Sequence, residues 1–202
     1  MNALRLSPAI LLALLVAACG IGKPPPSTTT YVVEPAPPTA GIGANASGQS
    51  LRMGSVRVAA AFARTALVYR VQESQYTADA YNAFIAEPAA MLGNEIASWL
   101  NNAGQFKSVS QPGATQPSPL VLEVTVTELY GDFRPQQTPA AVLSAQFNLI
   151  DTTQPRAKVV LERTLSSRIP LQQASPDALV QGYGRALGDV LTQFIAALNA
   201  RT

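Results

Sequence analysis

The sequence has no histidine and a single cysteine among its 202 residues. Without histidine, the commonest general base is missing, and so are the Ser-His and Cys-His nucleophile pairs and the usual histidine-containing zinc sites. One cysteine can form neither an intramolecular disulfide nor a Cys-x-x-Cys redox pair. These two absences exclude a large share of enzyme classes, and we predict no catalytic, metal or cofactor-binding residues.

Charged residues are also few. They make up 13% of the chain, and 14 Lys and Arg nearly balance 12 Asp and Glu. A nucleic-acid-binding protein usually carries a basic stripe or patch that contacts the phosphate backbone, and this composition offers none. Nucleic acid is therefore not an expected partner, and the length indicates one domain or at most two.

Residues 1–18 are typical of a secretory signal peptide. Arg5 and the terminal amine give a positive start, and the apolar run from Ala9 to Ala18 ends in small residues. A membrane-spanning helix needs about 20 apolar residues. The run of ten is too short to be an anchor by itself.

Small residues lead directly into the only cysteine, in the sequence Val-Ala-Ala-Cys-Gly at 16–20. This resembles the lipobox of bacterial lipoproteins, in which the cysteine receives a diacylglycerol, the signal is cut before it and the new amine is acylated. An ordinary signal peptide with an incidental cysteine is the alternative. Because each buried acyl CH₂ contributes about 0.8 kcal/mol and more than one chain gives stable anchoring, we predict Cys19 to be a lipid attachment site for fatty acids such as palmitate.

The residue after the cysteine bears on which membrane holds the protein. In lipoproteins of enteric-type bacteria an aspartate there tends to retain the protein at the inner membrane, and this chain has Gly20 instead. By that analogy we expect the periplasmic side of the outer membrane.

Residues 19–50 are rich in proline, glycine, serine, threonine and alanine. Such a composition buries little apolar surface and favours extended conformations, so we interpret these residues as a stalk. One run, 28–33, is β-branched and aromatic and predicts a short strand within the stalk.

Residues 51–202 are predicted to form the folded domain. Two early strands are expected at 51–58 and 66–71, and a helix from Pro88 to about Gly104 with one apolar face. Three alternating apolar runs follow, at 120–127, 143–149 and 159–169, and they indicate an antiparallel meander with one dry and one wet face.

The strongest helix pattern closes the chain. Ser175 is a suitable N-cap, Pro176 suits the first helical position, and a broad apolar stripe could continue for about 24 residues. The order of strands, helix, strands and helix predicts an α+β fold, in which two helices pack on one face of a mostly antiparallel sheet.

The remaining polar motifs do not form a recognisable reactive site. The candidate carboxylates are Glu87, Glu95, Glu123, Glu128, Asp132 and Asp177, and they lack the spacing of a metal site or a glycosidase pair, so we interpret them as solvated. The glycines of Gly-Tyr-Gly-Arg-Ala-Leu-Gly, 182–188, lie inside the last predicted helix rather than between a strand and a helix, so they indicate close packing of that helix and not a dinucleotide site.

Several short motifs together resemble the ABC-type transport auxiliary lipoproteins, a family that includes the lipoprotein partner of the paraquat-inducible MCE system. They are the lipobox, Tyr-Val-Val-Glu-Pro at 31–35, Val-Arg-Val at 56–58, Val-Tyr-Arg at 68–70, the Ala-Glu-Pro helix start at 86–88 and the long C-terminal helix. Many members place a tryptophan just before the Ala-Glu-Pro segment, where this chain has Phe84-Ile85.

The resemblance implies a non-enzymatic component of a system that moves lipids or other hydrophobic molecules between two membranes. The implied partner is the periplasmic MCE-domain protein of an ABC permease and ATPase, which the lipoprotein would dock at the outer membrane, and a homo-oligomer matched to that protein is implied by analogy. A structural or assembly lipoprotein that binds an outer-membrane or cell-wall partner is the alternative function. A hydrolase that uses carboxylates alone is a more remote one.

Overall fold

The computed structural model describes residues 27–38 and 48–200. Its centre is formed by three long antiparallel strands, β6 (Leu120–Asp132), β7 (Ala140–Asp151) and β8 (Lys158–Pro170). In the β6–β7 pairing Leu122 lies opposite Leu149, which places apolar side chains together on one face. The predicted meander is confirmed, and each of its strands extends beyond the apolar run that predicted it.

The outer edge of β6 is shared by two other strands. The first half of β6 pairs in parallel with β2 (Ser50–Val58), and the short strand β5 (Ser108–Ser110) lies beside β2. The end of β6 pairs in parallel with β3 (Ala66–Gln72), which follows β2 after a short 3₁₀ helix, η2 (Ala60–Phe62). The sheet is thus mixed, although its longest pairings are antiparallel.

A strand that the sequence did not predict, β4 (Gln75–Phe84), forms a hairpin with β3 through the two residues Glu73 and Ser74. Most of its side chains are exposed or half-buried, and only Phe84 is fully buried. Tyr76, Ala78 and Ala80 alternate with polar residues, but this alternation breaks at Tyr81, so the sequence holds only a short form of the pattern that reveals strands. On its outer side β4 pairs in parallel with β1 (Thr29–Tyr31).

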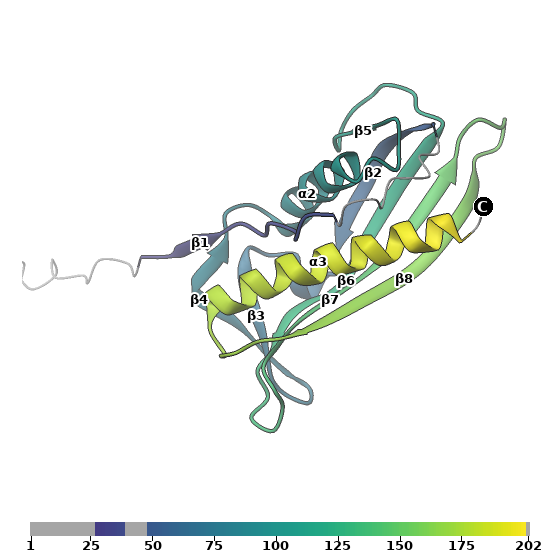
Figure 1. The fold of residues 1–202 in the computed structure, drawn as a ribbon. Helices are drawn as coiled ribbons and strands as arrows, with labels where there is room; N and C mark the ends of the chain where they lie inside the picture. The colour runs from purple at the N-terminus through teal and green to yellow at the C-terminus, as the bar shows by residue number, and fades with distance from the viewer. Residues whose placement is uncertain (1–26, 39–47, 201–202) are drawn as a thin grey trace, which may run out of the picture.

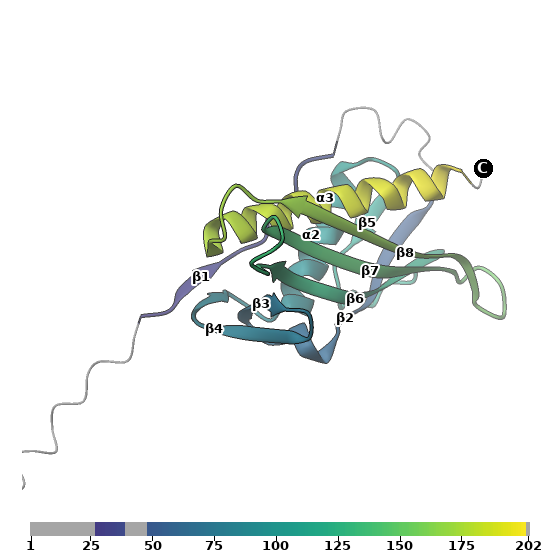
Figure 2. The same ribbon diagram turned by 90° about the horizontal axis from the view of Figure 1, so that it is seen from below.

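Two helices cover one face of the sheet, which we call the helix face (Figures 1 and 2). Helix α2 spans Pro88–Asn102, and helix α3 spans Pro176–Asn199, which is the predicted 24 residues. The Ser175 hydroxyl accepts a hydrogen bond from the Ala178 amide at 3.3 Å, so the predicted N-cap is confirmed. The fold is α+β, with eight strands and two helices in the part of the chain that the structure describes.

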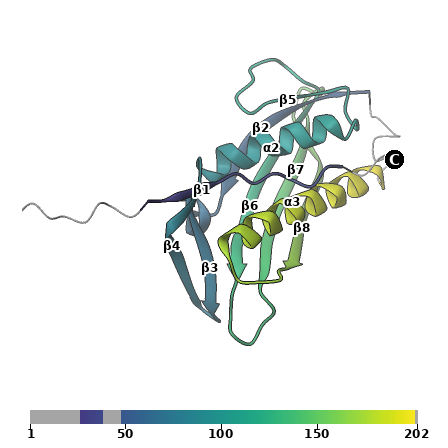
Figure 3. The same ribbon diagram turned by 60° about the vertical axis from the view of Figure 1, so that its left-hand side comes forward.

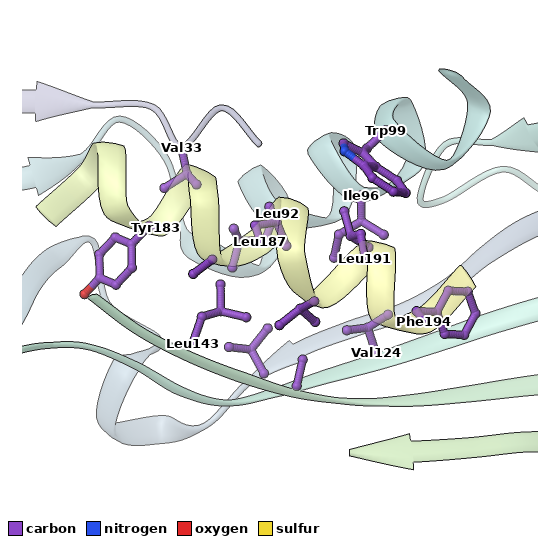
Figure 4. Packing of buried hydrophobic residues seen from close by; sticks show 14 of the residues in the cluster. Val33, Leu92, Ile96, Trp99, Val124, Leu143, Tyr183, Leu187, Leu191 and Phe194 are labelled. Carbon is purple, nitrogen blue, oxygen red and sulfur yellow. The ribbon is translucent and has the colours of Figure 1, made fainter. Parts of the chain in front are cut away.

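The hydrophobic core lies between the helices and the sheet. Leu92 and Ile96 of α2 and Leu187 and Leu191 of α3 point towards the same layer of sheet residues (Figure 4). Phe147 of β7 stacks on Phe194 of α3 with ring centroids 5.0 Å apart. Burial of these side chains is the main force that holds the helices on the sheet.

The opposite face of the sheet, which we call the open face, was predicted to be solvated, and this prediction is wrong at one end. Where β6 ends and β7 begins, Tyr130, Asp132, Val142 and Ser144 are all buried. Aromatic rings cover part of this region, because Phe62 and Tyr76 both contact the ring of Tyr130. The alternation of β6 and β7 showed which side chains face the helices, but it did not show that other side chains cover the second face.

Residues 27–38 fall within the predicted stalk, yet they lie on the domain. The strand predicted at 28–33 is present as β1, which is shorter, and the chain continues in an extended form as far as residue 38. The predicted signal peptide at 1–18, and the other stalk residues at 19–26 and 39–47, lie outside the described residues.

Candidate functional site

The N-terminal segment, which we define as residues 29–38, runs between the two helices (Figure 3). Val33 is completely buried, and it points into the space between the helices and the sheet (Figure 4). The Ala36 amide donates a hydrogen bond to the carbonyl oxygen of Gly184 on α3 at 3.0 Å. The Ala36 carbonyl accepts one from the indole Nε1 of Trp99 on α2 at 2.7 Å. One residue of the segment is therefore bonded to both helices.

Glycines on α3 make this close approach possible. A Cβ atom at Gly184 would overlap the Glu34 carbonyl oxygen, and one at Gly188 would lie 2.9 Å from the Ala36 carbonyl oxygen. Gly182 faces the sheet instead, where a Cβ would lie 2.7 Å from the Ala141 Cβ. The close packing predicted for these glycines is confirmed, and the partner of two of them is an extended chain rather than a helix.

A buried carboxylate organises the open face. Asp132, the last residue of β6, is completely buried and accepts hydrogen bonds from two arginines. Arg134 donates to it through Nε at 2.9 Å and Nη2 at 2.8 Å, and Arg168 of β8 donates through Nη1 at 2.6 Å. Hydrogen bonds from Arg134 and Arg168 hold the pKa of Asp132 well below its ordinary value, although burial acts in the opposite direction. The group is thus charged at any pH near neutrality.

A second carboxylate extends this network to the surface. Glu73, in the β3–β4 turn, receives one hydrogen bond from Arg134 and another from Arg70 at 2.9 Å. The Arg70 guanidinium also lies 5.8 Å from the centre of the Tyr76 ring. These contacts connect the tip of the β3–β4 hairpin to the β6–β7 connection, and a surface cavity of about 440 Å³ lies between the two. Val71, Gln72, Pro135 and two further glutamines, Gln136 and Gln137, line it together with Glu73 and Arg134.

A sequence model of the ABC-type transport auxiliary lipoprotein component matches residues 31–196. The chain belongs to this family. The match begins at Tyr31, inside the N-terminal segment, and ends near the end of α3, so the auxiliary lipoprotein domain includes the segment that lies between the helices.

Solved structures share this fold of the auxiliary lipoprotein. The crystal structure of the protein XCC0632 from Xanthomonas campestris is 17% identical, has a TM-score of 0.71, and the alignment covers 86% of this chain and 97% of that one. A second crystal structure, of an uncharacterised protein, is 19% identical, has a TM-score of 0.61, and the alignment covers 87% and 98% of the two chains. No curated protein matches the sequence significantly.

The residues predicted to matter for the auxiliary lipoprotein differ in what the structure shows of them. Cys19 lies outside the described residues. The interpretation of Asp132 as solvated is wrong, because Asp132 is buried and two arginines enclose it at the end of a strand. Glu128 is half-buried and accepts a hydrogen bond from the Ser144 hydroxyl at 2.6 Å. Arg134 and Arg168 follow Asp132 by two and 36 positions, and this spacing forms no recognisable motif. The sequence therefore did not indicate the cluster.

The described residues contain no cluster of three or more Asp, Glu, Cys or His side chains placed to hold a metal ion. None of the helices within these ranges is both long and apolar enough to span a membrane. The features that remain are the N-terminal segment between the helices and the charged network at the hairpin tips.

Proposed function

We propose that this auxiliary lipoprotein is a non-enzymatic, lipid-anchored component of the outer membrane that docks the periplasmic MCE-domain protein of an ABC transporter. The transported molecules would be lipids or other hydrophobic substrates that pass between the two membranes. The family match over residues 31–196 is the observation that carries this proposal. The lipobox at Cys19 and the Gly20 that follows it support the anchor and its location.

The position of the N-terminal segment supports a docking role. Thr29 lies only ten residues after Cys19, and from there the chain enters the sheet and passes between both helices. Ten extended residues span at most about 36 Å. An acylated Cys19 would therefore hold the domain close to the membrane and within reach of a protein that crosses the periplasm.

The charged hairpin tips support a surface for that partner. Along β4 the tip at Gln75 and the first residue paired with β1, Asn82, are seven residues apart, which corresponds to about 23 Å in a strand. The network of Arg70, Glu73 and Arg134 therefore projects away from the point where the anchor joins the domain. A ring of copies matched to the MCE assembly is part of the proposal, by analogy with the partner.

Purification of the tagged, acylated protein in mild detergent tests the proposal. We expect the MCE-domain protein encoded with this chain to be recovered with it, and native mass measurement of the complex gives the number of copies. Recovery of an outer-membrane assembly or cell-wall protein, without the MCE protein or its permease, would instead favour the assembly function.

The anchor has its own test. The Cys19→Ser variant is expected to remain as unprocessed precursor without incorporated palmitate, because the thiol that receives the lipid is gone. The Ser7→Ala variant is the matched control, because Ser7 lies within the predicted signal peptide but outside the lipobox. This protein should be processed normally. Palmitate that still enters the Cys19→Ser protein would contradict the assignment.

A further inference from the structure

Large apolar side chains gather where the N-terminal segment joins the sheet. Five such side chains are exposed among the described residues, and three of them, Val32 (42% exposed), Tyr81 (55%) and Ile85 (63%), belong to β1, β4 or the residues directly after them. The Ile85 amide donates a hydrogen bond to the Tyr31 carbonyl at 2.9 Å, so Val32 and Ile85 flank the same contact. Exposed apolar patches of this kind mark interaction sites on soluble domains.

The backbone that presents Tyr81 is fixed in an unusual form. Ala78 pairs with Val68, and Ala83 pairs with Ala66, so four residues of β4 lie opposite a single residue of β3. The Asp79 carboxylate holds this bulge, because it accepts the amides of Tyr81 at 2.8 Å and Asn82 at 3.0 Å. The Tyr69 hydroxyl donates to the other Asp79 oxygen at 2.5 Å. Bulges redirect side chains at sheet edges, and here the bulge holds Tyr81 outwards.

The charges at this end are mixed. The Phe84 amide donates to the Thr65 carbonyl at 2.7 Å, which places the exposed Arg64 at the same end as Ile85. Two acidic residues, Glu87 after β4 and Asp177 at the start of α3, offset this arginine. Tyrosine, an aliphatic side chain and arginine together are typical of the membrane–water interface. With one arginine against two acidic residues, these charges do not attract anionic lipids, so contact with a bilayer would be made through the apolar side chains.

The short length of chain between Cys19 and Thr29 indicates what this patch contacts. Tyr81 lies beside the start of β1, because Asn82 pairs with Thr29, and Thr29 is at most about 36 Å of extended chain from Cys19. We propose that Val32, Tyr81 and Ile85 rest in the headgroup region of the bilayer in which the acyl chains of Cys19 are inserted. This inference rests on the proposed lipid attachment at Cys19, and it assigns the membrane-facing surface of the domain.

Site-directed spin labelling of the mature, acylated protein tests this orientation. Acylation blocks the only native thiol, so Ile85→Cys supplies a single reactive site for the label. Val159→Cys is the matched control, since Val159 is 51% exposed and lies near the start of β8, which pairs with β7 at a different edge of the sheet from β1. Both proteins are placed in vesicles of phosphatidylethanolamine and phosphatidylglycerol, after mass measurement of the acylated N-terminal peptide.

We expect the label at position 85 to collide several-fold more with lipid-soluble oxygen, relative to a water-soluble nickel chelate, than the label at 159. Equal collision ratios at the two positions in an acylated protein would overturn the inference and leave the proposed anchor intact. Strong dipolar broadening at position 85 without lipid contact would overturn it in favour of a second copy of the chain. An unmodified Cys19 would overturn the anchor and the inference together.

Discussion

The helix face of the sheet and the buried end of its open face are held by different interactions. On the helix face, apolar side chains and backbone hydrogen bonds enclose the N-terminal segment between α2 and α3. On the open face, Asp132 and its arginines form the buried polar centre. Apolar packing is insensitive to pH, whereas a charged network depends on the ionisation of its carboxylates. The two faces should therefore respond differently to acid and to substitution.

The largest effect is expected on the helix face, from Phe147→Ala. Phe147 is fully buried and stacks on Phe194, so its loss leaves a cavity under α3. We expect a loss of about 3–4 kcal/mol in the free energy of unfolding, measured by urea denaturation and unchanged between pH 4 and pH 7. A loss below about 1 kcal/mol would mean that α3 is not held by this contact.

Substitution on the open face should lower the free energy of unfolding by a smaller amount, and that amount should depend on pH. Asp132→Asn keeps the shape but removes the charge that both arginines share, and we expect a loss of about 2 kcal/mol at pH 7, reduced from fully buried pairs because the arginines are partly exposed. The folded pKa of Asp132 lies below the unfolded value of 3.8. Its contribution is therefore complete above that value and is lost as the pH falls towards the folded pKa.

The unfolding free energies of Asp132→Asn and of the unchanged protein should consequently converge below about pH 4. A constant difference between the two proteins from pH 7 to pH 3 would contradict the assignment of the stabilisation to the ionised carboxylate. Phe147→Ala, measured over the same range, is the control for general acid unfolding.

A smaller effect is expected at the contact between α3 and the N-terminal segment. Gly184→Ala introduces a methyl group that overlaps the Glu34 carbonyl, and over-packing of this kind costs about 1–3 kcal/mol. The higher helix propensity of alanine offsets about 1 kcal/mol of this cost. We expect a net loss of about 1 kcal/mol in the free energy of unfolding, and faster proteolytic cleavage within residues 29–38. The control is Arg185→Ala, at the next position, which is exposed. This variant should be cleaved at the same rate as the unchanged protein.

The smallest effect is expected for Glu73→Gln at the hairpin tip. Glu73 is 79% exposed, so its two ion pairs are screened by solvent. Thermal denaturation should show that the free energy of unfolding changes by no more than about 0.5 kcal/mol. A loss as large as that of Asp132→Asn would show that the whole network, and not the buried carboxylate, stabilises the open face.

The same two faces show what the sequence can and cannot reveal. The core of the helix face was predictable because Leu187 and Leu191 repeat at helical spacing and Leu122 and Val124 alternate along a strand. The position of the N-terminal segment was not, because a proline-rich composition predicts extended chain without saying what it contacts. Gly184 and Gly188 indicated a close approach, but not the identity of the partner.

The open face was hidden for a different reason. Arg134 is only two residues from Asp132, but Arg168 reaches Asp132 only after the β6–β7 and β7–β8 hairpins have formed, so the complete cluster depends on tertiary structure. Strand β4 was missed because nearly all of its side chains are exposed or half-buried, so burial imposes little pattern on its sequence. The assignment of Cys19, in contrast, rests on its sequence neighbours alone and stays a prediction, because Cys19 lies outside the described residues.

The short tether proposed for Cys19 requires the N-terminal segment to be part of the folded domain. Hydrogen exchange of the Ala36 amide in the mature protein measures this directly, because that amide is bonded to the Gly184 carbonyl. We predict that it exchanges as slowly as the amides of α3 and that Gly184→Ala removes the protection. Exchange of Ala36 at the rate of an unprotected amide in the unchanged protein would contradict the position of the N-terminal segment between the helices.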